Sequence, residues 1–251
     1  MPSAFRLLGV RVDNVDEDEA LAIVADLADA GTPRQVVTLN PEFLVQAWEH
    51  EAFRRVLNGA HLAVADGVGV TLAARWLGHR PAGRVSGVDL VRRAAALGAA
   101  RGFRLFLLGG GPGIAEQAAE VLRRENPGLA IAGTHGGSPR VEEEEEIAER
   151  VRGGKPHFLF VAFGAPDQDL WIARNLKRLD VPVCVGIGGA FDYISGAVPR
   201  APAWMRRWGL EWLFRLMRQP WRWRRMMRLP RFVWLVLRHG SEGPSRERGP
   251  A

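Results

Sequence analysis

Polar residues that could do chemistry follow short apolar segments at several points along the first two hundred residues. They form five groups, which are Thr38-Leu39-Asn40, Asp66-Gly67, Gly109 to Gly113, Gly164 to Gln168 and Gly186 to Asp192. In an open parallel sheet, ligands bind beyond the carboxyl ends of the strands. The five groups are therefore predicted to meet at one edge of a sheet, where they would form a ligand site.

The candidate for acid–base chemistry is Asp66, which directly follows the predicted strand residues 61–65 and precedes Gly67. A carboxylate at the end of a strand can act as a general base if a substrate hydroxyl comes within hydrogen-bond reach. The other interpretation is that Asp66 caps the helix expected at about 67–77, because aspartate is a preferred N-cap residue. Position alone leaves both roles open.

Three glycines, Gly109, Gly110 and Gly111, open a turn between a predicted strand and a predicted helix. Backbone N–H groups in such a turn can bind an anion, and the helix dipole adds to the attraction, so a diphosphate would suit this place. The spacing differs from the dinucleotide pattern G-x-G-x-x-G, and no acid follows about 20 residues later. NAD binding is therefore disfavoured, and a plain tight turn is the alternative.

Metal chemistry has only weak candidates. Two D-x-D strings could hold a metal with a nucleotide diphosphate, at residues 16–18 and 167–169. Both also suit helix starts, because acids in the first turn complement the helix dipole. The six histidines have no metal-ligand spacing. We expect no metal ion and no other cofactor.

Apolar segments and helical patterns alternate along most of the chain, which predicts an α/β fold with a parallel sheet covered by helices. The expected strands lie in 5–12, 35–40, 61–66, 103–109, 129–135, 157–164 and 181–188. Helices are expected to start near Asp16 and Pro41 and to lie in 67–77, 88–100, 114–125, 141–152 and 168–177. The single cysteine, Cys184, excludes an intramolecular disulfide and fits a buried thiol in a reducing compartment.

The last part of the chain differs in composition from the rest. Residues 200–238 hold eleven arginines, six of the nine tryptophans and one acid, Glu211. Prolines divide this part into expected helices at about 203–218, 221–229 and 231–238. We therefore predict a body (1–198), a basic amphipathic helical appendage (199–239) and a disordered tail (240–251).

Basic amphipathic helices with tryptophan lie in membrane interfaces. Alternating arginine and aromatic residues also suit single-stranded nucleic acid, and a dimer interface is a third interpretation. The chain shows no secretory pattern and no apolar run of the roughly 20 residues that a membrane helix needs. We expect a cytoplasmic protein that binds peripherally to the inner face of the cell membrane, either as a monomer or as a homo-oligomer.

The combination of these segments resembles the WecG/TagA/CpsF glycosyltransferase family over about residues 5–238. The segments that carry the resemblance are VVTLNPEFLVQA, VADGVGV, RVSGVDLV, LFLLGGGPGIAE, FVAFGAPDQDLW, GIGGAFDYISG and the tail that starts RAPAWMRRWGLEWLFRL. The resemblance implies a Rossmann-like body with a C-terminal membrane-docking appendage that closes the active site. It also implies a metal-independent, inverting transfer of N-acetylmannosamine or a related sugar from UDP to a polyprenyl-diphosphate-linked glycan, in cell-surface polysaccharide synthesis.

The resemblance also implies roles for single residues. Asp66 looks like the catalytic base and Gly109, Gly110 and Gly111 like the turn on the nucleotide side. The residues that look like substrate contacts are Thr38, Asn40, Arg84 and Gln168, and those that look like diphosphate contacts are Arg215, Arg222 and Arg225. The sequence departs from the family at Asp167, where a lysine is usual, and this change creates the second D-x-D string.

Two other functions compete with this hypothesis. The first is a non-catalytic protein that binds nucleotides or nucleic acid and grips phosphates with its arginine-rich tail, although we expect no nucleic-acid partner. The second is a sugar-nucleotide enzyme with soluble substrates, which leaves the basic and aromatic tail without a role.

Overall fold

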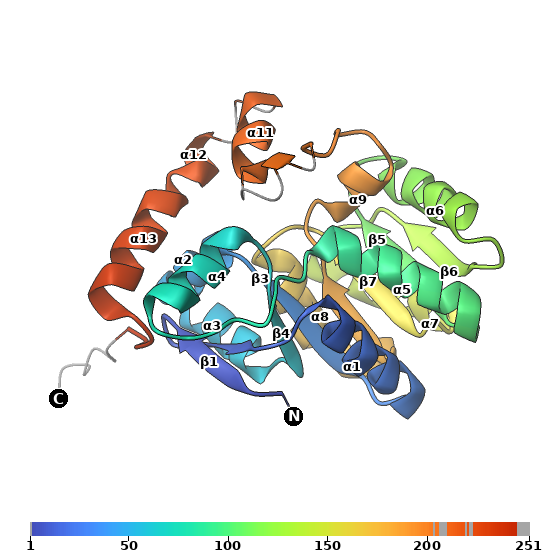
Figure 1. Ribbon diagram of the computed structural model, residues 1–251. Coiled ribbons are helices and arrows are strands. Elements are labelled where there is room, and N and C mark those ends of the chain that lie inside the picture. Colours follow the sequence, from blue (N-terminus) through green and yellow to red (C-terminus); the bar gives the residue numbers. More distant parts are fainter. Residues whose placement is uncertain (1, 203, 206–209, 219, 221–222, 245–251) are drawn as a thin grey trace.

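A computed structural model describes residues 2–202, 204–205, 210–218, 220 and 223–244, and only the backbone of residues 224 and 225. Its centre is a six-stranded parallel sheet with the spatial order β4-β3-β8-β7-β5-β6 (Figure 1). The strands are β3 (Arg34–Leu39), β4 (Leu62–Ala65), β5 (Arg104–Gly109), β6 (Ala130–His135), β7 (Phe158–Ala162) and β8 (Val183–Gly186). The predicted Rossmann-like parallel sheet is confirmed.

Helices cover both faces of this sheet, which explains why its inner strands carry apolar side chains on both faces. The helices of the body are α1 (Glu17–Ala30), α2 (Pro41–Glu49), α3 (Glu51–Gly59), α4 (Val68–Trp76), α5 (Gly87–Arg101), α6 (Ile114–Glu125), α7 (Glu144–Gly154), α8 (Asp167–Leu179) and α9 (Ala190–Ile194). Helices α1, α5 and α6 pack with Val36 and Val185 on one face. On the other face, α2, α3 and α4 pack with Val37, and α7 and α8 pack with Cys184.

The prediction of a single strand over residues 5–12 was wrong. The chain forms two short antiparallel strands there, β1 (Ala4–Leu7) and β2 (Val10–Asp13), which are separate from the main sheet. Leu8 and Gly9 join them with φ angles of 49° and 76°. Two successive residues with positive φ make the type of turn that matches the twist of a hairpin. The glycine supplies this geometry inside what reads in the sequence as one apolar run.

The helix starts follow the local chemistry. The Asp16 carboxylate accepts hydrogen bonds from the backbone N–H groups of Asp18 and Glu19, and Glu19 completes a capping box. The Asn40 side chain caps α2 through a 3.0 Å hydrogen bond from the Phe43 N–H. Helices α3 and α9 were not predicted from the sequence, because α3 starts two residues after α2 ends and α9 has only five residues.

The C-terminal part contains α11 (Glu211–Arg218), α12 (Trp223–Met226) and α13 (Arg228–His239). Figure 1 shows α11 and α12 beyond the carboxyl ends of the strands and α13 running back along the body beside α2. Helix α13 continues through Pro230, where the sequence predicted a break. Pro230 is the third residue of α13, where the N–H group that proline lacks would have no partner within the helix.

Helix α13 is part of the body's hydrophobic core. Its side chains Phe232, Leu235 and Val236 are buried in the same cluster as α2 and α3. The backbone oxygens of residues 240 and 241 then accept hydrogen bonds from the N–H groups of Leu8 and Gly9. Part of the predicted appendage and the start of the predicted tail are thus packed on the body, while residues 245–251 lie outside the described part. Among the described helices, none has the length and apolar character needed to cross a bilayer.

Candidate active site

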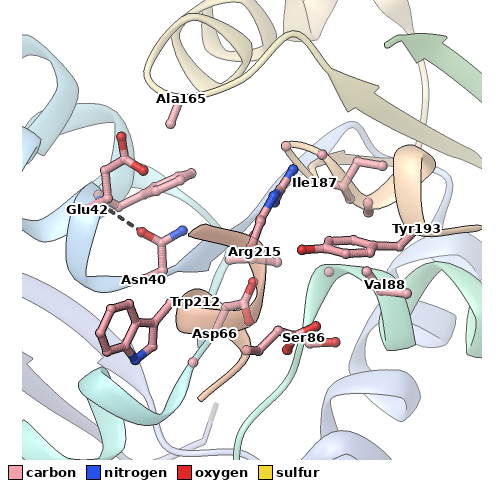
Figure 2. A pocket seen from close by; sticks show the side chains of 18 of the residues that line it. Asn40, Glu42, Asp66, Ser86, Val88, Ala165, Ile187, Tyr193, Trp212 and Arg215 are labelled. Carbon is pink, nitrogen blue, oxygen red and sulfur yellow. Dashed lines mark hydrogen bonds between the residues drawn. The ribbon is translucent and has the colours of Figure 1, made fainter. Parts of the chain in front are cut away.

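A cavity of about 720 Å³ opens at the carboxyl ends of the strands. Each of the five polar groups that the sequence singled out contributes residues to its wall, and further residues come from α2, α4, the segment 84–88 and the helices α11, α12 and α13. Residues that line it include Thr38, Asn40, Glu42, Asp66, Leu72, Arg84, Ser86, Gly110, Gly111, Gly164, Gly188, Asp192, Tyr193, Arg200, Glu211, Trp212, Arg215 and Met226. Figure 2 shows side chains from both ends of the chain around this space. A cavity of this size fits a nucleotide-sized ligand.

Asp66 lies at this cavity directly after β4. Its own N–H donates a 2.7 Å hydrogen bond to the Leu39 oxygen on the neighbouring strand, which fixes the backbone. The residue at the N-cap of α4 is Gly67, and no side chain caps that helix. The capping interpretation of Asp66 is therefore excluded by the geometry, and its carboxylate accepts a hydrogen bond from the Gly87 N–H.

Burial raises the pKa of Asp66 to about 7. The hydrogen bond from Gly87 and the charge of Arg84 lower this pKa, whereas the negative charges of Glu211 and Asp89 raise it. A carboxyl group with a pKa near neutrality can accept and release a proton under physiological conditions. Two carboxylates that were not predicted as site residues thus contribute to the proton affinity of Asp66.

Thr38 lies near the end of β3 and Asn40 directly follows this strand, and both line the cavity. The Thr38 hydroxyl donates a 3.1 Å hydrogen bond to the backbone oxygen of Gly186, so this side chain also ties β3 to β8. The Asn40 oxygen is engaged in capping α2. Figure 2 shows the Asn40 side chain on the side of the cavity where Glu42 and Trp212 also lie.

The glycine turn after β5 is only partly as predicted. Gly110 and Gly111 line the cavity, whereas Gly109 lies outside its wall. The Gly110 N–H donates a 3.2 Å hydrogen bond to the backbone oxygen of Ala162, so it is engaged within the protein. Gly109 and Gly110 have φ angles of 94° and 84°, which explains why residues with side chains are unsuited to this turn.

The structure places only some of the arginines that were predicted to contact the substrate (Arg84) or its diphosphate (Arg215, Arg222 and Arg225). The Arg215 guanidinium reaches from α11 into the cavity, 3.6 Å from the Asp192 carboxylate and 4.9 Å from the centre of the Tyr193 ring (Figure 2). Arg84 also lines the cavity. Arg222 lies outside the described residues, and the backbone of Arg225 belongs to α12 while its side chain is outside the described part.

Arg200 is a third arginine at the cavity, and the sequence did not single it out as a site residue. Arg200 forms a two-pronged ion pair with Asp89, at 2.7 Å to each carboxylate oxygen, and lies 3.6 Å from Glu211. Asp89 is in the first turn of α5, where it also accepts a hydrogen bond from the Ser86 hydroxyl. The signal in the sequence was that both residues lie in segments that carry the family resemblance, since Arg200 opens the tail RAPAWMRRWGLEWLFRL and Asp89 lies in RVSGVDLV. This network joins α5 to α11.

The structure separates the two acids of the second D-x-D string. Asp167 is exposed at the start of α8, whereas the side chain of Asp169 is completely buried. The two carboxylates therefore cannot share one metal ion. Within the described part of the chain, no group of three or more potential ligand side chains could hold a metal.

Gln168 is not at the cavity, although the sequence suggested a substrate contact. Its side chain is fully buried behind the wall, where it bonds to backbone N–H groups of the protein. Successive residues of a helix point in different directions. Asp167 faces the solvent at the start of α8, and the next residue, Gln168, faces the sheet.

Comparison with known proteins agrees with this arrangement. The model of the glycosyl transferase WecG/TagA/CpsF family matches residues 5–246. The chain belongs to the WecG/TagA/CpsF glycosyltransferase family. As a glycosyltransferase it is an enzyme, which favours the catalytic hypothesis over a protein that only binds nucleotides or nucleic acid.

Three curated relatives of this glycosyltransferase carry the name N-acetylglucosaminyldiphosphoundecaprenol N-acetyl-beta-D-mannosaminyltransferase. The protein from Bacillus spizizenii (strain W23) is 34% identical over 204 residues, which cover 81% of this chain and 79% of that protein. The protein from Bacillus subtilis (strain 168) is 32% identical over 203 residues, with 81% and 78% covered. The protein from Staphylococcus aureus (strain MW2) is 32% identical over 194 residues, with 77% and 74% covered.

Proposed function

We propose that this glycosyltransferase moves N-acetylmannosamine, or a related sugar, from a UDP-sugar to a polyprenyl-diphosphate-linked glycan. The observation that carries the proposal is the position of Asp66, a carboxyl group with a raised pKa in a nucleotide-sized cavity that arginines also line. The names of the relatives supply the acceptor class and the transferred sugar. Cell-surface polysaccharide synthesis is the pathway class that uses such lipid-linked glycans.

Asp66 acts as the general base in this proposal. Its carboxylate takes the proton from an acceptor hydroxyl as that oxygen attacks the anomeric carbon of the donor sugar, and the bond from that carbon to the UDP oxygen breaks. One displacement of this kind inverts the configuration at the anomeric carbon. The departing diphosphate carries negative charge, which Arg215 and Arg84 can stabilise. The proposed step uses no metal ion and no cofactor.

We further propose that the enzyme binds peripherally to the inner face of the cell membrane, where a lipid-linked acceptor is found. Exposed large apolar side chains gather on the C-terminal part and on α4. They are Leu72, Trp76, Trp204, Trp212, Met217, Trp223, Met227, Val233, Trp234 and Leu237. Tryptophan prefers the interface of a bilayer, and clustered arginines attract anionic lipids. Leu72 and Trp212 also line the cavity, so the apolar surface continues to the proposed active site.

Release of UDP tests the proposed activity. The full-length chain is incubated with a panel of UDP-sugars, with and without a short-chain lipid-diphosphate-linked N-acetylglucosamine. We expect UDP release that requires both one of these donors and the acceptor, together with a product heavier by one sugar. Release that is independent of the acceptor would show a hydrolase instead, and no release with any UDP-sugar would refute the proposed donor class.

A further inference from the structure

Gln168 and Asp169, the second and third residues of α8, are fully buried behind the wall of the cavity. The side-chain oxygen of Gln168 accepts two backbone hydrogen bonds, from the N–H of Gly164 at 3.2 Å and from the N–H of Gly188 at 2.9 Å. Gly164 belongs to the loop after β7 and Gly188 to the loop after β8, and both line the cavity. One side chain thus joins two loops that form the site.

The orientation of the Gln168 amide depends on Asp169. A glutamine side chain can present either its oxygen or its NH₂ group in a given direction. Here the NH₂ group donates a 3.2 Å hydrogen bond to Oδ2 of Asp169, so the oxygen must face the two glycine N–H groups. Asp169 is itself fixed, because its backbone oxygen accepts a 3.0 Å hydrogen bond from the Gln35 side chain on β3.

The side chains of Gln168 and Asp169 are tightly packed against the backbone of β8. A Cβ atom on Gly186 would lie 2.5 Å from Oδ1 of Asp169 and 2.6 Å from the NH₂ nitrogen of Gln168. Oδ1 of Asp169 is buried and has no hydrogen-bond partner among the described residues. Leaving a buried polar atom without a partner is costly, so a role in stability alone does not explain a carboxyl group at this position. Burial also raises the pKa of Asp169 to about 7, well above its ordinary value of 3.8.

The loop after β8 packs against Arg215 at the cavity. A Cβ atom on Gly189 would lie 2.6 Å from a terminal nitrogen of Arg215, which shows how closely that guanidinium approaches the loop. Asp192 and Tyr193, which also contact Arg215, follow in the same segment. A shift of this loop would therefore move the groups that hold Arg215.

We propose that Asp169 is a positioning residue, which acts through Gln168 to hold the loops after β7 and β8 in the geometry that the transfer needs. It touches neither substrate nor reacting atoms. Its effect is to fix the direction of one amide, which then binds the two loops at Gly164 and Gly188. The turnover measurement below rests on the proposed function, whereas the exchange measurement does not.

Three variants separate positioning from stability. Asp169→Leu removes the acceptor, whereas Asp169→Asn keeps an oxygen for the Gln168 NH₂ group. The double variant Gln168→Met with Asp169→Leu removes both polar side chains together, and the Gly164 and Gly188 N–H groups, which line the cavity, are then left to bond to water there. Its thermal midpoint is measured as the check on folding. Hydrogen exchange at the Gly164 and Gly188 amides, followed by NMR, reports the loops. kcat and KM for the UDP-sugar report the transfer.

We expect the double variant to fold stably, to exchange the two glycine amides about tenfold faster and to lose kcat by roughly 10- to 100-fold. Asp169→Asn should keep slow exchange and a kcat within about threefold of the wild type. Slow exchange at both glycines in the stable double variant would overturn the proposal. It would also fail if Asp169→Asn lost as much activity as Asp169→Leu, because the carboxyl group itself would then be required. A wild type without turnover would instead refute the proposed function, and the exchange result would still stand.

Discussion

The Arg215 guanidinium lies 3.6 Å from the Asp192 carboxylate, and this contact joins helix α11 of the C-terminal part to helix α9, which follows the last strand of the sheet. Both side chains line the cavity beside the glycine loop after β8. The contact therefore brings an arginine from a basic segment that is distant in sequence into the site that the strands build.

Replacing Arg215 should impair transfer much more than replacing its partner. Arg215→Gln is expected to lower kcat/KM by about 10²-fold, because it removes a charged donor from the place where the departing diphosphate is proposed to lie. Asp192→Asn should change kcat/KM less than about threefold, since the 3.6 Å separation makes this a weak, partly solvated ion pair. Steady-state kinetics on both variants tests this. Equal losses would mean that the ion pair, and not the arginine, is what matters.

Asp66→Asn should lose most turnover and gain stability. The loss is expected to be roughly 10²- to 10⁴-fold, which is the usual contribution of a general base. Because the folded-state pKa of Asp66 is raised to about 7, its ionisation destabilises the fold as pH rises above its unfolded value of 3.8. The variant should therefore unfold at a higher temperature than the wild type at pH 8, with a difference that vanishes near pH 4. Normal turnover in the folded variant would remove Asp66 from the mechanism.

The pH–rate profile should report the ionisation of Asp66. The base must be unprotonated, so kcat/KM is expected to fall as pH decreases through about 7. Glu211→Gln removes a negative charge that raises the pKa of Asp66, and the acidic limb should move to lower pH. Glu120→Gln, at an exposed position on α6, serves as the control and should leave the profile unchanged. An unshifted limb in Glu211→Gln would show that the two carboxylates do not interact.

Removal of metal ions should leave activity nearly unchanged. Asp167 is exposed and Asp169 is buried, so the D-x-D string does not form a two-carboxylate site. EDTA treatment followed by the UDP-release assay measures this, and Asp167→Asn should retain wild-type kcat. Strong inhibition that magnesium or manganese reverses would assign the reaction a metal ion.

Membrane binding should depend on the exposed face of α13, while its buried face should matter for stability. Val233, Trp234 and Leu237 are each more than half exposed. Replacing these three by serine should weaken co-sedimentation with anionic vesicles and leave the thermal midpoint close to that of the wild type. Phe232→Ala is the matched control, because it should cost about 3–5 kcal/mol of stability through the loss of core packing. High salt should weaken vesicle binding, since it screens the arginines.

A double variant separates membrane binding from transfer. Arg222→Ala with Arg225→Ala is expected to lower transfer more than vesicle binding, because many other arginines remain in residues 200–238. Truncation after Val198 is a poor test by comparison. It removes Phe232, Leu235 and Val236 from the core, and so it changes stability together with membrane binding. Vesicle binding that falls in parallel with transfer in the double variant would count against separate roles.

The sequence by itself determined the parallel sheet, most helix starts and the edge where the site lies. These properties are local. Apolar runs of strand length, an acid such as Asp16 ahead of a helix and a proline such as Pro41 at a helix start act within a few residues, so they can be recognised without knowing the fold. The rule that ligands bind at the carboxyl ends of parallel strands then selected Thr38, Asn40 and Asp66 together.

Only the tertiary structure decided which side chains face the cavity and which are buried behind it. The direction of the Gln168 side chain depends on how α8 lies against β8, which no local pattern encodes. The same holds for Arg200, whose partner Asp89 is 111 residues away. The pKa of Asp66 also depends on distant groups, because burial and the charge of Glu211 act through space. The sequence thus specified the elements, whereas desolvation and long-range contacts set the chemistry of the site.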